Sequence, residues 1–67
     1  MKLTAATITD AQIRELRGRA DAQGDIVLVY LCCDALRILC EGRERASDFA
    51  AREARARCAD LLNARTK

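Results

Sequence analysis

The stretch IVLVYLCCDALRILCE, from Ile26 to Glu41, decides the fold of this 67-residue chain. Its charged side chains Asp34, Arg37 and Glu41 follow one another at spacings of three and four, and Tyr30 lies four residues before Asp34. On a helix these positions form one narrow polar stripe, and the rest of the circumference is apolar. The pattern therefore predicts a helix over 26–41. A buried β-strand at IVLVYL is the alternative, because Ile, Val and Tyr also favour strands.

A second helix is expected before this stretch. Thr9 and Gln12 have the spacing of a capping box, in which each side chain binds the other residue's backbone N–H. Gly24 suits the left-handed position that ends a helix, and Asp25 can then cap the next one. These signals predict a helix over 10–23. Its expected buried side chains are Ile13, Leu16 and Ala20.

A third helix is expected after Gly42, because the chain contains no proline and is rich in the helix-forming residues Ala, Leu, Arg and Glu. Ser47 or Asp48 is the expected cap, and the helix should run over 48–64. Phe49 is expected to close one end of the core. The expected inner face is formed by Ala50, Ala54, Cys58, Leu61 and Leu62.

These elements predict an all-α fold, a small three-helix bundle in one domain spanning residues 1–67. Residues 1–7 form an N-terminal arm and residues 65–67 a frayed tail. A chain of this length buries only roughly 60% of the surface that its unfolded form exposes, so its own core is thin. We expect no linker that would divide it into two domains.

The apolar surface of 26–41 exceeds what the other two helices can cover, because their inner faces are narrow or built of alanine. We therefore expect a homodimer that packs this helix against its two-fold mate. The alternative is a monomer whose N-terminal arm lies across the exposed side through Leu3 and Ile8. The side chains predicted to mediate self-association are Val27, Tyr30, Leu31, Leu36 and Leu39.

The four cysteines are interpreted as apolar core residues rather than as ligands. Cys32 and Cys33 are adjacent, so their side chains point about 100° apart on a helix and do not suit one metal centre. Cys33 and Cys40 would lie two turns apart on 26–41, about 10 Å along the axis, beyond the reach of a disulfide. Cys58 alone could pair with a thiol of that helix. We expect no metal and no cofactor.

Nucleic-acid binding is an alternative carried by the basic end of the chain. Residues 42–67 hold seven basic and four acidic side chains, although the whole chain has a net charge of +2. The spacing of Ala20, Gly24 and Tyr30 fits a helix-turn-helix, but the second helix would offer a DNA groove only apolar side chains. The side chains predicted to contact phosphate or an acidic partner are Arg43, Arg45, Arg52 and Arg55.

Enzymatic activity is not expected, because the chain contains no histidine, no glycine-rich phosphate loop and no nucleophile beside a base. The opening MKLTAATITD is not an apolar signal segment, so we expect a cytoplasmic protein. No apolar run reaches the 18 or more residues that span a bilayer, so no membrane association is expected.

The chain also resembles a group of short bacterial, phage or plasmid proteins of no established activity. The resemblance lies in ITDAQIRELR, in the GD pair at Gly24, in Cys33 with Asp34, and in AR and CA at Ala54 and Cys58. It implies a small helical accessory protein of a mobile element. We therefore expect a non-catalytic interaction protein that self-associates and binds another protein, as an inhibitor or adaptor. A small nucleic-acid-associated factor is the alternative.

Overall fold

The first helix, α1, spans Asp10–Gln23 in the computed structural model, which describes residues 2–65. Both hydrogen bonds of the predicted capping box are present. The Thr9 hydroxyl accepts from the Gln12 N–H at 3.2 Å, and the Gln12 side chain accepts from the Thr9 N–H at 2.9 Å. Gly24 ends the helix at φ 72°, as predicted, because glycine adopts a left-handed conformation without a Cβ clash.

The second helix, α2, spans Ile26–Leu36 and begins at Asp25, whose carboxylate accepts from the Leu28 N–H. The strand alternative for IVLVYL is therefore wrong. The predicted end at Glu41 is also wrong, since the helix stops five residues earlier. Arg37 takes the left-handed conformation at φ 55°, and the N–H of Ile38 donates to the Cys33 carbonyl across the turn. This closing bond ends the helix and turns the chain back.

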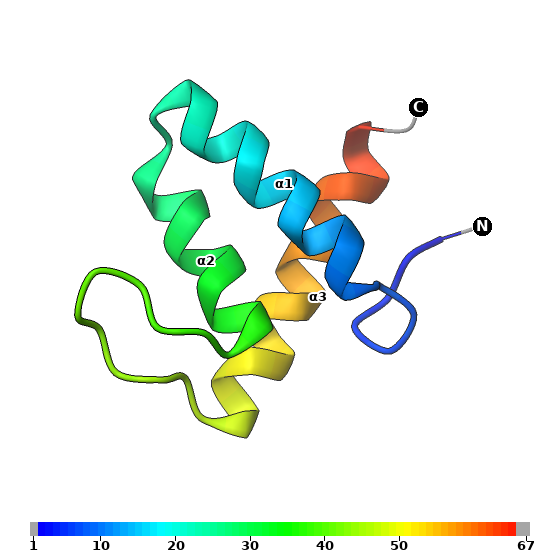
Figure 1. The fold of residues 1–67 in the computed structure, drawn as a ribbon. Coiled ribbons are helices and arrows are strands. Elements are labelled where there is room, and N and C mark those ends of the chain that lie inside the picture. The colour runs from blue at the N-terminus through cyan, green and yellow to red at the C-terminus, as the bar shows by residue number, and fades with distance from the viewer. Residues whose placement is uncertain (1, 66–67) are drawn as a thin grey trace.

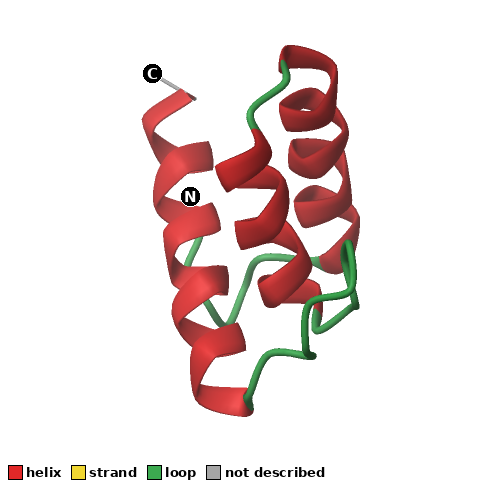
Figure 2. Cartoon of the chain, turned by 90° about the vertical axis from the view of Figure 1, so that its left-hand side faces the viewer, coloured by secondary structure: helices red, strands yellow, loops and turns green. Residues whose placement is uncertain are grey.

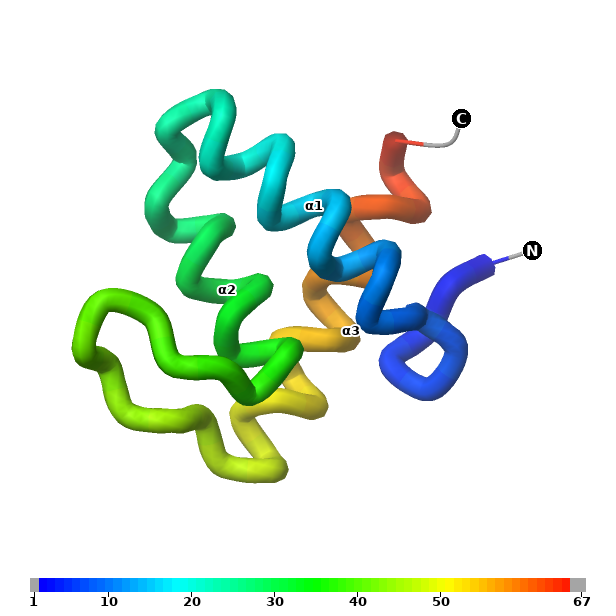
Figure 3. The backbone as a smooth tube through the Cα atoms, viewed as in Figure 1, coloured from blue at the N-terminus to red at the C-terminus, as the bar shows by residue number. Residues whose placement is uncertain are grey.

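Residues 37–47 form a loop that returns along α2 before the third helix begins (Figure 3). Glu41 and Gly42 both have positive φ, and the Arg43 N–H donates to the Cys40 carbonyl, as in a tight hairpin turn. Arg37 and Glu41, which were expected on the polar stripe of a longer helix, therefore lie in this loop.

The third helix, α3, spans Asp48–Arg65, one residue longer than predicted, and Ser47 caps it through a hydrogen bond from the Ala50 N–H. Of the predicted tail, residues 66 and 67 lie outside the described residues. The predicted inner face is only partly right, because Ala50 and Leu61 are exposed and Ala51 and Ala59 are buried instead. Ala54 and Cys58 are buried as expected.

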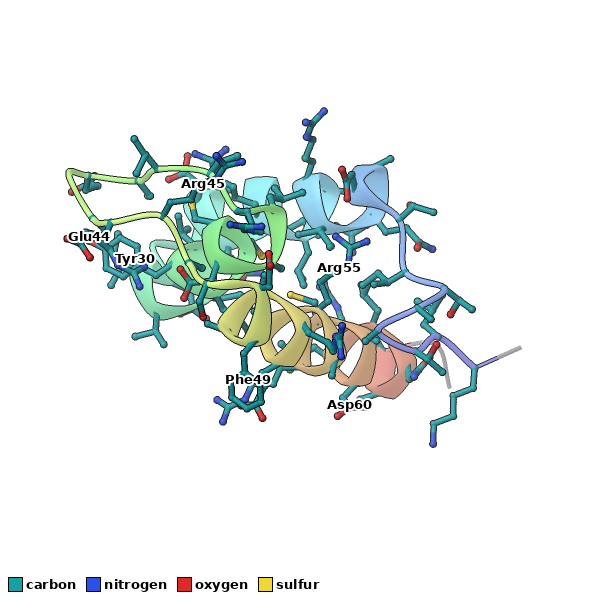
Figure 4. The ribbon with its side chains drawn as sticks, turned by 90° about the horizontal axis from the view of Figure 1, so that it is seen from below. Tyr30, Glu44, Arg45, Phe49, Arg55 and Asp60 are labelled. Carbon is teal, nitrogen blue, oxygen red and sulfur yellow. The ribbon has the colours of Figure 1, made fainter. Side chains whose placement is uncertain are left out.

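The prediction that Phe49 closes the core is wrong. Its side chain is 73% exposed and points away from the bundle on the outer side of α3 (Figure 4). Helix α3 is oriented about its axis so that Ala51 and Ala59 face the core. Phe49 lies two residues before Ala51 and therefore faces a different direction, away from the core.

The three helices pack into the predicted all-α bundle, with α2 contacting both α1 and α3 (Figures 1 and 2). One group of buried side chains joins all three helices, and a second lies between α1, α2 and the loop. Ile13, Leu16 and Ala20 are buried on α1, as predicted. The core members of α2 are Val29, Cys32, Cys33 and Ala35.

Arg55 connects α3 to the other two helices from a side chain that is three-quarters buried. Its guanidinium donates to the carbonyl of Ile8 at 2.7 Å and to that of Ala35 at 3.3 Å. It also forms an ion pair with Asp10 at 2.9 Å. In Figure 4 the side chain extends from α3 toward the start of α1. Arg55 therefore satisfies backbone carbonyls at two points where the elements meet.

The N-terminal arm lies against the end of α3 and reaches only the end of α2, not the side that carries Val27. The N–H and carbonyl of Leu3 form hydrogen bonds with the side chain of Asn63, at 2.8 and 2.9 Å. Leu3 also packs on the core. The arrangement expected for the monomer alternative, with the arm covering the exposed side of α2, is thus not the one found.

Replacing Arg55 by methionine is expected to lower the free energy of unfolding by about 2 kcal/mol, because the buried carbonyls of Ile8 and Ala35 lose a charged donor. Urea denaturation measures the change. Arg52→Met, on the same helix, is the matched control and should change stability by less than about 0.5 kcal/mol. Equal effects of the two substitutions would contradict the role given to Arg55.

Candidate functional site

An open groove of about 450 Å³ runs between α2 and the second half of α3. Its floor is apolar and its rim carries two acidic side chains and one basic side chain. We call it the α2–α3 groove. It is lined by Asp25, Val27, Leu28, Tyr30, Leu31, Asp34, Arg57 and Leu61.

The apolar side chains of the groove include some of the most exposed in the described chain. Val27 is 75% exposed and Leu61 is 41% exposed, and Ile26, next to Val27, is 49% exposed. Val27 lies seven residues before Asp34 and three before Tyr30, so it belongs to the outward stripe of α2. In the first turn of α2, the side chain that faces outward is therefore apolar.

The structure brings together three of the five side chains predicted to mediate self-association. Val27, Tyr30 and Leu31 line the groove. Leu36 is half-buried and packs against the bundle's own core. Leu39 is 67% exposed, but it lies on the loop and does not line the groove.

The loop covers the part of α2 next to the groove. The guanidinium of Arg43 lies 4.6 Å from the centroid of the Tyr30 ring, within the range of a cation–π contact. The same group pairs with both carboxylate oxygens of Asp34 at 3.3 Å. Ile38 and Cys40 pack beside Val29 and Cys33. The chain thus covers one side of α2 itself and leaves the groove open.

The four arginines predicted to contact phosphate or a partner fall into two groups. Arg43 and Arg55 are held by several acceptors of the chain itself, as described above. Arg45 uses its Nε–H on the carbonyl of Arg37 at 3.0 Å. Arg52 is exposed and forms no hydrogen bond or ion pair within residues 2–65. The predicted basic face of the third helix is therefore not one continuous surface.

Leu61 was missed as a surface residue, because the sequence places it with Leu62 on the inner face. Alanines occupy several directions around α3, so the pattern of apolar residues does not fix which side faces the core. The signal that could have identified the groove lies on α2, where Val27 falls in line with Tyr30 and Asp34.

The thiols form two hydrogen-bonded pairs inside the bundle. Cys32 of α2 and Cys58 of α3 are free thiols, both fully buried, and a hydrogen bond joins them. This bond, and then burial, raise the pKa of Cys32, while the bond donated by Cys32 lowers the pKa of Cys58. Three of the four cysteines, including Cys33, are buried as the core interpretation requires.

Cys33 and Cys40 form the second pair, and the prediction that they lie two turns apart is wrong. The turn at Arg37 brings the half-buried Cys40 back onto Cys33. Burial, and then the hydrogen bond with Cys40, raise the pKa of Cys33 to about 11, although Arg17 of α1 acts in the opposite direction.

Within residues 2–65, no three histidine, cysteine or acidic side chains come together in a way that suits a metal ion. None of the described helices has both the length and the apolar character of a bilayer-spanning segment.

Comparisons of this chain with protein-family models, curated proteins and solved structures return no match. The resemblance to short phage or plasmid proteins therefore stays a prediction.

The raised pKa of Cys33 predicts that the folded state loses stability at alkaline pH. Burial raises the pKa of Cys33 from its ordinary value of 9.0, which applies to the unfolded chain, to about 11 in the folded one. Its protonated form therefore stabilises the fold fully below pH 9, and this contribution is lost as the pH rises through 11. Urea denaturation at stepped pH should show the free energy of unfolding falling over this range.

Cys33→Ala is the control for this pH effect. Its free energy of unfolding should fall less steeply with pH, because the residual alkaline dependence then comes from Cys32 and other groups. An unchanged slope in this variant would contradict the assignment to Cys33.

Proposed function

We propose that this protein is a non-catalytic interaction module that associates with a second copy of itself through the α2–α3 groove and binds another protein. The observation that carries the proposal is the exposure of Val27 beside Leu61 on a surface whose neighbours are charged. Exposed apolar side chains that lie together and are rimmed by polar ones are typical of interaction sites.

The size of the domain supports self-association. Burying apolar surface contributes about 25 cal/mol per Å², and a bundle whose inner face on α3 is alanine and cysteine gains little of it internally. A second copy that covers Val27, Leu31 and Leu61 would bury apolar surface that a single chain leaves exposed in the groove. Small scaffolds often gain stability in this way.

The charges at the rim favour a two-fold arrangement. Asp25, which caps α2, and Asp34 of α2 line one side of the groove, and Arg57 lines it from α3. In an antiparallel pair, the acidic side of one copy can face Arg57 of the other, so the same surface complements itself. Asp34 is already paired with Arg43, which leaves Asp25 as the better partner for Arg57.

The proposal assigns no catalytic residue. It places the protein in the cytoplasm, where four free thiols remain reduced. Its partner is another protein, and the role of inhibitor or adaptor in a mobile element comes from the resemblance alone. The nucleic-acid alternative through the third helix has less support, because Arg43 and Arg55 are engaged within the chain.

Val27→Glu is expected to convert a concentration-dependent dimer into a monomer, because an unpaired charge would enter the apolar contact. The substitution should not unfold the monomer, because Val27 is exposed in the first turn of α2, where the helix dipole favours a carboxylate. Sedimentation at several concentrations measures the state, and circular dichroism checks the fold.

Phe49→Glu is the matched control, because Phe49 is as exposed as Val27 but lies on the outer side of α3. It should leave the dimer intact. A wild-type protein that stays monomeric at high micromolar concentration would contradict self-association. Dissociation by Phe49→Glu but not by Val27→Glu would contradict the choice of surface.

A further inference from the structure

A second, larger pocket of about 750 Å³ lies where the N-terminal arm, the end of α2 and the first half of α3 meet. Four guanidinium groups and two carboxylates line it, which leaves an excess of two positive charges. We call it the arginine pocket. It shares no lining residue with the α2–α3 groove. Its charged side chains are Arg37, Arg45, Arg52, Arg55, Asp10 and Asp48.

Two of the four arginines are fixed by the fold. Arg55 is held by Ile8, Ala35 and Asp10, as described above. Arg37 donates through Nε to the Ala46 carbonyl at 3.2 Å and through Nη1 to the Asp48 carboxylate. Their positive charges are held at the pocket before any ligand arrives, so no ordering cost is associated with them on binding.

The other two arginines have donors to spare. A guanidinium carries five N–H groups, and Arg45 uses only its Nε–H within the described chain. That bond, to the carbonyl of Arg37, anchors the side chain by its inner nitrogen and leaves both terminal nitrogens available. Arg52 lines the same pocket and has no partner within residues 2–65.

The carboxylates of the pocket do not neutralise Arg45 and Arg52. Asp10 is paired with Arg55, and Asp48 is paired with Arg37. The unneutralised charge at the pocket therefore belongs to Arg45 and Arg52. Both carboxylates stand in the first turns of α1 and α3, so the positive ends of these helix dipoles also lie near the pocket.

We propose that the arginine pocket binds a phosphoryl group of a small molecule, with Arg45 and Arg52 as the donors. A phosphate dianion matches the excess of two positive charges, and its oxygens accept the paired N–H groups of guanidinium in a planar, bidentate geometry. An extended nucleic-acid backbone fits less well, because Arg43 and Arg57 do not line the pocket and Arg43 is already paired with Asp34.

Titration of ¹⁵N-labelled protein with pyrophosphate, and separately with inorganic phosphate, tests this site by nuclear magnetic resonance at fixed ionic strength. Saturable shifts of the Arg45 and Arg52 Nε–H signals are expected with one or both probes. Arg52→Gln should weaken binding about tenfold. This variant keeps every hydrogen bond of the described chain in place, so a loss of fold would not explain the result.

Arg14→Gln is the matched control, since Arg14 is an exposed arginine of α1 that does not line the pocket. It should bind as the wild type does. Shifts that do not saturate with either probe, or an equal loss in both variants, would overturn the proposal. Binding of a short DNA duplex without binding of pyrophosphate or phosphate would also overturn it, because a polyanion would then be the ligand.

Discussion

Helix α2 ends at Leu36 because Arg37 adopts a left-handed backbone conformation, and the position of the whole following loop depends on that turn. A non-glycine residue in this conformation is uncommon and requires support from its surroundings. The support comes from the side chain of Arg37, which binds Ala46 and Asp48 at the other end of the loop, and from Arg45, which binds the Arg37 carbonyl. The turn brings Ile38 and Cys40 against one side of α2 and leaves the other side, with Val27, uncovered.

The bundle is built from small side chains, and charged ones connect its parts. The buried residues of α3 are three alanines and Cys58, and each of these small side chains contributes little apolar area. Arg55 compensates by donating to the carbonyl of Ile8, just before α1, and to that of Ala35, in the last turn of α2, where carbonyls have no partner within the helix. Such bonds fix the positions of the helices relative to one another even where apolar contact is sparse. Arginines of the loop also donate to backbone carbonyls, Arg37 to that of Ala46 and Arg45 to that of Arg37.

Local signals predicted the starts of the helices and the end of α1, whereas the end of α2 and the rotation of α3 depend on long-range contacts. The capping box at Thr9 and the left-handed Gly24 involve neighbours in the chain, so residue type and spacing were enough. The left-handed Arg37, where α2 ends, is held by side-chain bonds to residues about ten positions away, which no local pattern indicates. For the candidate groove, the exposure of Val27 could be predicted, because Val27 lies on the same side of the helix as Asp34. The exposure of Leu61 could not be predicted, because alanines point in several directions around α3 and do not show which side of that helix faces the core.

The self-association that we propose requires a second copy of the chain to lie in the α2–α3 groove. Nuclear Overhauser effects filtered between isotope-labelled and unlabelled chains in a mixed sample report contacts between copies directly. We expect such effects from the methyl groups of Val27 to those of Leu31 or Leu61 on the other copy. A dimeric sample in which the effects between copies came only from Leu39 or Phe49 would contradict it, since those exposed side chains lie outside the groove.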